Sequence, residues 1–226
     1  MKALLNEKLP QLTDVQRDML CAYYEYLMQA NARTNLTAIK EKTEAADKHF
    51  VDSLLALPFI PHGARCIDVG TGAGFPGIPL LIARPDIKMT LLDSLHKRVA
   101  FLQETLHELG LSANCVHARA EDAGRDPRHR AQYDIALSRA VAPLSVLLEL
   151  TVPFLRVGGV SVCYKGKSAQ EEADLAQSAG KALNCTLKVQ PIDAAYGERA
   201  LVLAKKNAST PSRYPRKAGE PGRKPL

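Results

Sequence analysis

A cluster of glycines near residue 70 is the part of the chain whose residue types most clearly suggest ligand chemistry. The segment reads Asp68-Val69-Gly70-Thr71-Gly72-Ala73-Gly74-Phe75-Pro76-Gly77-Ile78-Pro79. Closely spaced glycines permit positive φ angles and let a ligand approach the backbone where a Cβ would block it. The apolar run before Asp68 predicts a buried strand, and Pro79 marks the start of a helix. A strand that turns through glycines into a helix is typical of the ligand-binding edge of an α/β sheet.

Two kinds of cofactor fit this turn. The segment from Gly72 to Gly77 matches the dinucleotide pattern G-x-G-x-x-G, and Asp93 lies about 20 residues further on, where an acid would hold a ribose. However, the strand runs directly into Gly70, so the tight turn begins two residues before that match. Asp68 also places a carboxylate beside the turn, which suits a cationic sulfonium ligand better than an anionic pyrophosphate. The residues therefore favour S-adenosylmethionine, with NAD as the alternative.

Further polar residues follow the next two expected strands. Asp93 ends a strand and is placed to accept hydrogen bonds from both ribose hydroxyls, although it could also cap the helix that begins near Ser94. After the third strand, Glu121 could accept from the exocyclic amine of adenine while the Ala120 backbone contacts the ring. Alternatively, this acidic loop is solvated and contacts no ligand.

Two cations occupy equivalent positions further along the chain. Arg139 follows the fourth expected strand and Lys165 follows the fifth. An arginine at the carboxyl end of a strand, beside the glycine turn, is placed to meet a carboxylate or a phosphate. For both residues an unrelated surface ion pair is the alternative.

These positions depend on an alternation of strands and helices. Strands are expected at 66–69, 89–92, 114–117, 135–137, 159–164 and 201–204, and helices at about 77–84, 94–109, 143–155 and 168–182. The alternation predicts an α/β fold with a doubly wound, mostly parallel sheet and helices on both faces.

Helical patterns alone precede the first strand. Thr13 and Gln16 form a capping box for a helix that reaches about Asn31, and a second helical run over about 43–57 stops before Pro58. We read these helices as a cap without a core of its own. The expected organisation is an N-terminal helical cap over 1–60, a methyltransferase domain over 61–206, and a basic, proline-containing tail over 207–226.

The net charge of the chain is concentrated at its C-terminal end. Residues 205–226 hold seven basic residues against Glu220, and the resulting +6 equals the net charge of the whole chain. A cationic tail on a neutral body suggests contact with a polyanion. The candidate contacts of the tail are Arg213, Arg216, Lys217, Arg223 and Lys224. Its four prolines argue against regular structure, and a solvated terminus or a tail pinned against the body are the alternatives.

Composition narrows the class of protein. A hydrophobic content of 46% and a charged content of 24% are ordinary for a globular protein. No segment approaches the roughly 18 continuous apolar residues that span a bilayer. Five widely spaced cysteines without a C-x-x-C motif predict reduced thiols, with neither a disulfide framework nor a metal site. We therefore expect a cytoplasmic protein that does not contact membranes.

The motifs taken together resemble those of a known family. The similar segments are Asn35-Leu36-Thr37-Ala38-Ile39, His49-x-x-Asp52-Ser53-Leu54, the glycine segment 68–79, Ser138-Arg139-Ala140-Val141-Ala142, Lys165-Gly166 and Tyr214–Gly219. They resemble the bacterial 16S rRNA guanine-N7 methyltransferases, also called the glucose-inhibited division protein B family. The resemblance covers nearly the whole chain. It implies a class I (Rossmann-like) methyltransferase fold with added N-terminal helices, and S-adenosylmethionine as cofactor.

The resemblance also implies roles for individual residues. It implies cofactor contacts by Gly70, Phe75, Ala120, Glu121 and Arg139, beside Asp68, Gly72, Gly74 and Asp93 from the motifs above. Candidates for the side of the cleft that faces the target are Asn35, His49, Arg139, Lys165 and Arg199. The implied partner is 16S rRNA or the small ribosomal subunit, methylated at a guanine in a conserved loop by a monomeric enzyme. The resemblance assigns nothing to the loop 124–132 beyond a basic contact.

Methylation at guanine N7 does not require a catalytic acid or base from the protein. N7 carries a free lone pair at neutral pH, so the reaction needs no general base. Alignment of N7, methyl carbon and sulfur can contribute several kcal/mol, up to roughly 7–11. No side chain is therefore assigned as catalytic, and we expect a structural or RNA-contacting role for His49. The remaining alternatives are an NAD-dependent oxidoreductase, a methyltransferase acting on another RNA or a small molecule, and a non-catalytic RNA-binding protein.

Overall fold

The computed structural model describes all 226 residues and contains one seven-stranded sheet. The strands are β1 (Arg65–Val69), β2 (Lys88–Asp93), β3 (Asn114–His117), β4 (Tyr133–Arg139), β5 (Leu155–Lys165), β6 (Cys185–Ile192) and β7 (Arg199–Lys206). Their order is β3-β2-β1-β4-β5-β7-β6, and β7 alone runs in the direction opposite to the other six strands. The predicted doubly wound, mostly parallel sheet is confirmed.

The strand order reverses between β1 and β4. The chain builds β2 and β3 on one side of β1 and then returns to place β4 on its other side, with Asp68 beside Leu137. In open α/β sheets ligands bind at this switch point, outside the carboxyl ends of the strands. The glycine turn after β1 and Arg139 at the end of β4 therefore meet at one edge of the sheet.

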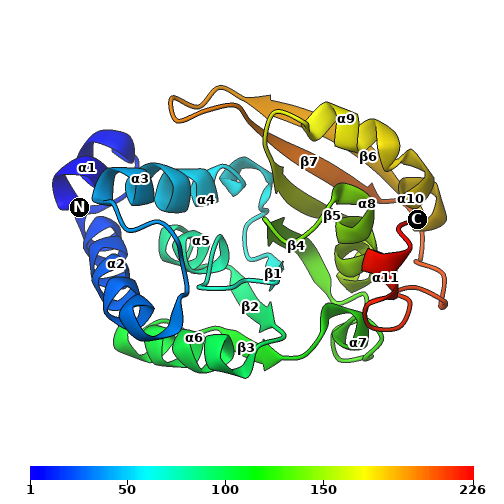
Figure 1. Cartoon of the computed structure of the whole chain (residues 1–226), viewed down its shortest axis with the longest axis horizontal. Helices are drawn as coiled ribbons and strands as arrows, with labels where there is room; N and C mark the ends of the chain where they lie inside the picture. Colours follow the sequence, from blue (N-terminus) through cyan, green and yellow to red (C-terminus); the bar gives the residue numbers. More distant parts are fainter.

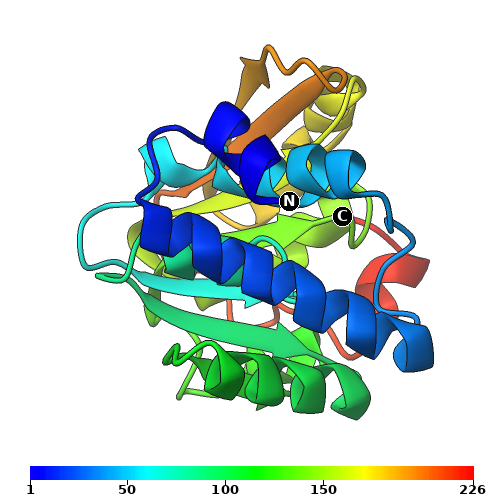
Figure 2. The ribbon, with the colours of Figure 1, turned by 90° about the vertical axis from the view of Figure 1, so that its left-hand side faces the viewer.

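Helices cover both faces of the sheet (Figures 1 and 2). In chain order the helices are α1 (Lys2–Lys8), α2 (Asp14–Thr34), α3 (Lys42–Ala45), α4 (Asp52–Leu54), α5 (Gly77–Ala83), α6 (His96–Glu108), α7 (Ala120–Ala123), α8 (Leu144–Thr151), α9 (Ala169–Leu175), α10 (Gln177–Ala182) and α11 (Glu220–Arg223). The helices before α7 share one buried cluster with one face of the sheet, and α8 to α10 share another with the opposite face. Burial on both faces explains why the strands are nearly continuous apolar runs.

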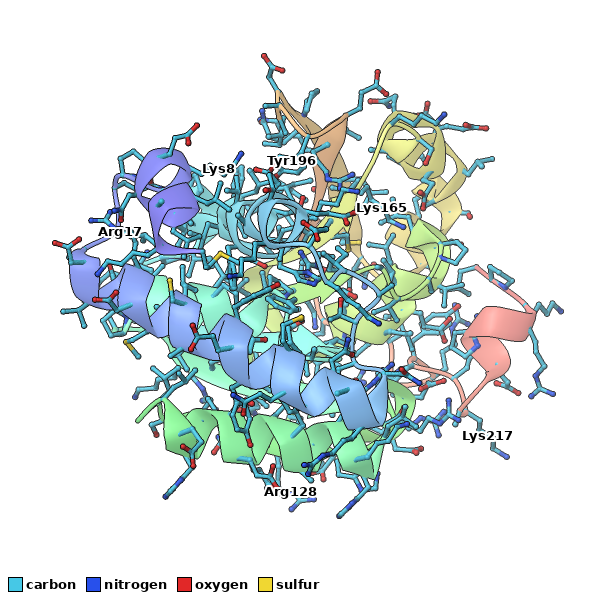
Figure 3. All side chains as sticks on the ribbon, turned by 60° about the vertical axis from the view of Figure 1, so that its left-hand side comes forward. Lys8, Arg17, Arg128, Lys165, Tyr196 and Lys217 are labelled. Atoms are coloured by element: carbon cyan, nitrogen blue, oxygen red, sulfur yellow. The ribbon has the colours of Figure 1, made fainter.

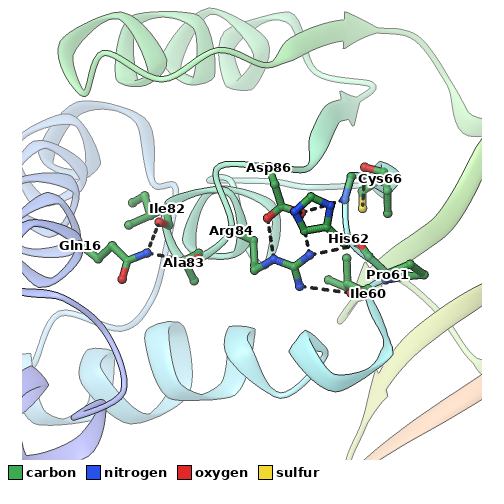
Figure 4. Close-up of polar contacts among 11 residues, drawn as sticks. Gln16, Ile60, Pro61, His62, Cys66, Ile82, Ala83, Arg84 and Asp86 are labelled. Atoms are coloured by element: carbon green, nitrogen blue, oxygen red, sulfur yellow. Dashed lines mark hydrogen bonds and ion pairs between the residues drawn. The ribbon is translucent and has the colours of Figure 1, made fainter.

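The N-terminal helices pack directly on the sheet domain. The predicted capping box is present, since Thr13 N–H donates to Gln16 Oε1 at 2.9 Å and Gln16 N–H donates to Thr13 Oγ1 at 3.3 Å. The Gln16 amide then donates to the carbonyls of Ile82 and Ala83 at the end of α5 (Figure 4). Helix α2 contacts α5 and α6, with α6 drawn below it in Figure 2, and buries Tyr23 in the shared core.

Two expectations about secondary structure are corrected. The helix expected at 43–57 is interrupted, because Ala46–Val51 forms a π-helical stretch between α3 and α4. Single π turns inside α-helices are frequent at functional sites, and this one carries His49. Strand β6 was not predicted, although Cys185–Ile192 alternates between exposed and less exposed positions as an edge strand does. Pro191 is tolerated there because β6 is the edge of the sheet.

The C-terminal segment is packed against the body rather than free, and near its end it forms the short helix α11 (Figure 1). Arg125 Nε donates to the Pro215 carbonyl at 2.8 Å, and Arg130 Nη1 donates to the Tyr214 carbonyl at 2.7 Å. The prolines therefore do not prevent regular structure, contrary to expectation. The loop 124–132 supplies these arginines, so two of its basic residues hold the tail.

No helix of the chain has the length and apolar character needed to cross a lipid bilayer.

Candidate active site

The glycine turn is fixed to the neighbouring strand by its backbone. Gly70, Gly72 and Gly74 have φ angles of 71°, 62° and 102°, a region that residues with a side chain rarely adopt. Gly70 N–H donates to the Leu92 carbonyl at 2.9 Å. Gly72 N–H donates to Asp93 Oδ2 at 3.0 Å. The end of β2 thus sets the shape of the turn after β1.

Asp68 is an internal support of this turn. Its side chain is fully buried, and Oδ2 accepts from Thr71 Oγ1 at 2.7 Å and from Gly77 N–H at 2.9 Å. A Cβ on residue 77 would lie 2.4 Å from Leu91 and 2.9 Å from this carboxylate, which explains the glycine. Oδ1 has no hydrogen-bond partner. Burial raises the pKa of Asp68 to about 6.

A cavity of about 250 Å³ opens beside the turn. We call it the cofactor cavity, and its walls include Gly70, Asp93, Ala120, Glu121 and Val141. A Cβ on residue 70 would come within 2.8 Å of Val141 Cγ2, so a larger residue could not occupy this wall without displacement. These residues lie at or after the ends of four strands, β1 to β4, and the sheet brings the strand ends together.

Asp93 holds several donors at the mouth of this cavity. Its Oδ1 accepts from Leu95 N–H at 2.9 Å, and Oδ2 accepts from Gly72 N–H and, at 3.4 Å, from Arg98 Nη1. An ionised carboxylate offers about four acceptor sites, so these three donors leave room for a ligand hydroxyl. Helix α6 begins at His96 with Leu95 as its N-cap, and Asp93 supports this start from outside the helix.

Glu121 connects the cofactor cavity to the C-terminal segment. Its side chain is buried, and Oε1 accepts from Gly219 N–H at 2.8 Å. Behind the cavity, Arg216 Nε and Nη2 both contact the carboxylate of Glu149 on α8, which has no exposed surface. The tail therefore forms part of the structure that supports the cavity.

A second cavity, of about 430 Å³, lies on the other side of the segment that follows β4. We call it the target cavity. Four of the five predicted target-facing residues line it: His49, Arg139, Lys165 and Arg199. Asn35 does not. It is exposed at the left-handed C-cap of α2, with φ of 49°. Ala140 lines both cavities and so marks where they meet.

Asp52 organises the target cavity, a role that the sequence reasoning missed. Its Oδ2 accepts from Arg139 Nη1 at 3.0 Å, and its Oδ1 accepts from Arg199 Nε at 2.9 Å. The Tyr196 hydroxyl donates to the same Oδ1 at 3.4 Å. The only signal in the sequence was its place in the motif with His49, three residues before it on the interrupted helix.

An aromatic stack supports the wall of the target cavity, which His49 and Arg139 line. The His49 ring lies on the Phe75 ring with centroids 4.2 Å apart, and Arg139 Cζ lies 5.1 Å from the Phe75 centroid. His49 Nε2 is 2.9 Å from Thr37 Oγ1. Burial, together with the nearby charge of Arg139, lowers the pKa of His49 to about 4. The imidazole is therefore neutral at physiological pH, as a packing role requires.

The other predicted cations differ in whether they already form ion pairs with carboxylates of the protein. Lys165 Nζ donates to Glu172 Oε2 at 2.6 Å and to the Ala142 carbonyl at 2.9 Å. In the tail, Arg216 is committed to Glu149 and is not a free cation, contrary to its expected role in RNA contact. The other tail candidates, Arg213, Lys217, Arg223 and Lys224, are exposed. Figure 3 labels Lys217 beside α11, away from Lys165.

The sheet order, the single antiparallel strand β7 and the glycine turn after β1 define the class I methyltransferases. Solved structures agree. An O-methyltransferase from Bacillus cereus in complex with SAH superimposes with a TM-score of 0.59 at 15% identity, covering 81% of this chain and 90% of that one. A putative O-methyltransferase from Klebsiella pneumoniae gives 0.60 at 17% identity, covering 90% and 94%. These similarities establish the fold.

Residues 16–201 match the family described as rRNA small subunit methyltransferase G. Proteins named ribosomal RNA small subunit methyltransferase G are similar over nearly their whole length. The relative from Desulforamulus reducens is 47% identical over 221 residues, covering 95% of this chain and 92% of its own. That from Alkaliphilus oremlandii is 44% identical over 222 residues, covering 96% and 93%. The chain belongs to this family, and the predicted family, enzyme class and cofactor are confirmed.

Proposed function

We propose that this enzyme transfers a methyl group from S-adenosylmethionine to N7 of a guanine in 16S rRNA. The observation that carries the proposal is the pair of cavities that meet at Ala140. One is lined by Gly70 of the glycine turn and by Asp93, and the other is lined by four cations. A cation-lined cavity beside a methyl-donor site suits a polyanionic substrate such as RNA.

The residues of the cofactor cavity fit S-adenosylmethionine. Asp93 has acceptor capacity left for the ribose, and Ala120 and Glu121, which line the same cavity, would face the adenine. The unpartnered Oδ1 of Asp68 adds negative potential beneath the turn, where the amino-acid part of the cofactor would lie. When bound, the cofactor supplies an electrophilic methyl group on a positively charged sulfur.

The target cavity needs to orient the guanine and exclude water, because N7 attacks with its own lone pair. Neutral His49 cannot act as a strong acid, and no base is required. Methylation places a positive charge on the guanine ring. Asp52 lies among the cations of this wall and offsets part of the resulting repulsion. The role of the pocket residues is therefore alignment and electrostatic balance.

We further propose that the exposed cations of the tail, Arg213, Lys217, Arg223 and Lys224, contact the RNA backbone. The protein would act as a monomer in the cytoplasm, where rRNA is assembled into subunits.

Labelled methyl transfer tests this function. Small ribosomal subunits, and rRNA extracted from them, are taken from cells that lack the protein, and the modified base is mapped. The proposal predicts one labelled guanine in 16S rRNA, carrying the methyl group at N7. An Asp93→Ala variant, which should bind the cofactor poorly, serves as the matched control. Label on another nucleotide or another atom, or no label with either substrate, would overturn the proposal.

A further inference from the structure

Arg199 is the cation of the target cavity with the most unused donor capacity. Only its Nε makes a hydrogen bond, to Asp52 Oδ1 at 2.9 Å, so Nη1 and Nη2 have no partner. Its Cζ lies 5.4 Å from the centroid of the Tyr196 ring. The guanidinium is therefore held on one side by a carboxylate and against an aromatic ring. Its two terminal nitrogens form a free fork, and a fork of this kind matches two oxygens of a phosphate.

Lys165 stands next to this fork on the neighbouring strand. Lys165 on β5 pairs with Ala200 on β7, the residue after Arg199, and both cations line the target cavity. Figure 3 labels Lys165 and Tyr196 on the same side of the molecule. Lys165 Nζ uses two of its three donors, on Ala142 and Glu172. A ligand held by Arg199 is thus within the field of a second cation.

The local charge balance leaves a single positive charge. Four cations line the target cavity: Lys48, Arg139, Lys165 and Arg199. Three carboxylates pair with them, namely Asp52, Glu172 and Glu44. The excess of one positive charge balances the single negative charge of one phosphodiester. A cavity of this composition is poorly suited to an uncharged ligand alone.

The position of the Arg199 fork along the sheet indicates which part of the RNA it would face. Arg139 ends β4, next to the strand that carries the glycine turn, whereas Arg199 begins β7, two strands further along the sheet. Two strand spacings separate the backbones by about 10 Å, although both side chains reach the same carboxylate, that of Asp52. A reacting base would lie near Ala140, where the cavities meet, and the fork would then face the sugar-phosphate backbone.

We propose that Arg199, oriented by Asp52 and Tyr196 and assisted by Lys165, binds one phosphodiester of the RNA segment that carries the target guanine. This inference rests on the proposed function and deepens it. Arg139 Nη1 already donates to Asp52 and to the Lys48 carbonyl. In this arrangement Arg139 faces the base, whereas Arg199 contacts the RNA backbone. The contact is the same before and during methyl transfer, so it contributes to substrate affinity and not to the chemical step.

The test compares Arg199→Gln with wild type in methyl transfer to undermethylated small subunits at several salt concentrations. KM for the RNA substrate should rise about 10- to 100-fold, as loss of a charge-assisted contact implies, with kcat nearly unchanged. The slope of log KM against log salt should fall by about 0.7–0.9. Arg199→Lys should recover the salt slope but only part of the affinity, because lysine lacks the fork. Cofactor affinity by calorimetry should not change.

The matched control is Arg156→Gln. Arg156 is an exposed arginine that also pairs with a carboxylate, Asp134, but it lies at the opposite end of β5 from Lys165. This variant should behave as wild type. If wild type does not methylate the subunits, the proposed function fails. If wild type is active and Arg199→Gln keeps its KM and salt slope, only the phosphate site is wrong. A fall in kcat with unchanged KM would also overturn it. Should Arg199→Gln not fold, an unchanged KM in Arg199→Lys would contradict the proposal.

Discussion

The two cavities on either side of Ala140 are built in different ways. The cofactor cavity is shaped by backbone, by glycines at positive φ and by buried carboxylates that accept from backbone N–H groups. The target cavity is shaped by long side chains from the cap, β4, β5 and β7, which a single carboxylate, Asp52, helps to hold together. Substitutions near the first should therefore act on folding and cofactor affinity, and substitutions in the second on the RNA reaction.

The largest effect is expected behind the cofactor cavity. Arg216→Ala removes the charged partner of Glu149, a fully buried carboxylate, and leaves it only the N–H of residue 216 as donor from the tail. The loss should cost about 3–5 kcal/mol of unfolding free energy. Lys217→Ala, one residue further along and exposed, should change it by less than about 0.5 kcal/mol. Denaturant melts of the two variants check this. Equal stability would show that the tail does not support the body.

Removing residues 207–226 should consequently destabilise the protein and weaken cofactor binding. If the tail only contacted RNA, its removal would leave cofactor binding intact. The contact from Gly219 to Glu121 and the pair between Arg216 and Glu149 argue for the opposite result.

Asp68 should give the cofactor side a characteristic pH dependence. Because burial raises its pKa from 3.8 to about 6, the folded state holds this proton more tightly than the unfolded state. Its contribution therefore makes stability fall as pH rises from about 4 to about 6, by on the order of 2–3 kcal/mol. The difference in stability between wild type and Asp68→Asn, followed across this range, isolates the effect. Saturating cofactor should reduce the fall, because its positive charge favours ionised Asp68. A constant difference would contradict this assignment.

On the target side, Arg139→Ala should reduce methyl transfer about 10- to 100-fold, through loss of about 1.5–3 kcal/mol of charge-assisted bonding. Asp52 keeps Arg199 and Tyr196 as partners, so the fold should survive with a smaller loss of stability. Arg139→Lys should recover only part of the rate. Rates under saturating cofactor, with a melt for each variant, provide the check. Near-normal turnover in Arg139→Ala would remove this residue from the site.

The smallest effect is expected at the link between the tail and Glu121. Gly219 has φ of 81°, and nothing lies within 4 Å of a Cβ there, so Gly219→Ala introduces backbone strain without a clash. It should cost about 1–2 kcal/mol of stability. Cofactor affinity should fall by less than tenfold, because the contact to Glu121 is shifted and not removed. Calorimetry and a melt on the same sample test both. Normal stability with a large loss of affinity would mean that Gly219 contacts the cofactor directly.

The same contrast explains which parts of the molecule could be predicted from sequence. The cofactor side follows from one continuous segment and from residues at strand ends, so Gly70 and Asp93 were located by periodicity and spacing. The target side depends on contacts between distant segments. Asp52 is 87 residues from Arg139 and 147 from Arg199, and neither separation leaves a local pattern.

The tail shows the same limit. Its composition indicates a polar, proline-rich terminus, and nothing in that composition reveals that its carbonyl groups match Arg125 and Arg130. Those partners lie 80 to 90 residues earlier in the chain. Strand β6 was missed for another reason. Its alternation is visible in the sequence, but Pro191 weakens it beside the stronger pattern of β7.

The most direct test of the division between the two cavities is amide NMR of the protein titrated with S-adenosylhomocysteine, the cofactor without its methyl group. We expect the large shift changes at Gly70, Asp93, Ala120 and Glu121, which line the cofactor cavity, and at Gly72, which donates to Asp93. We expect little change at Lys165 and Arg199, on the other side of Ala140. Large changes at Lys165 and Arg199, with none in the glycine turn, would contradict this account.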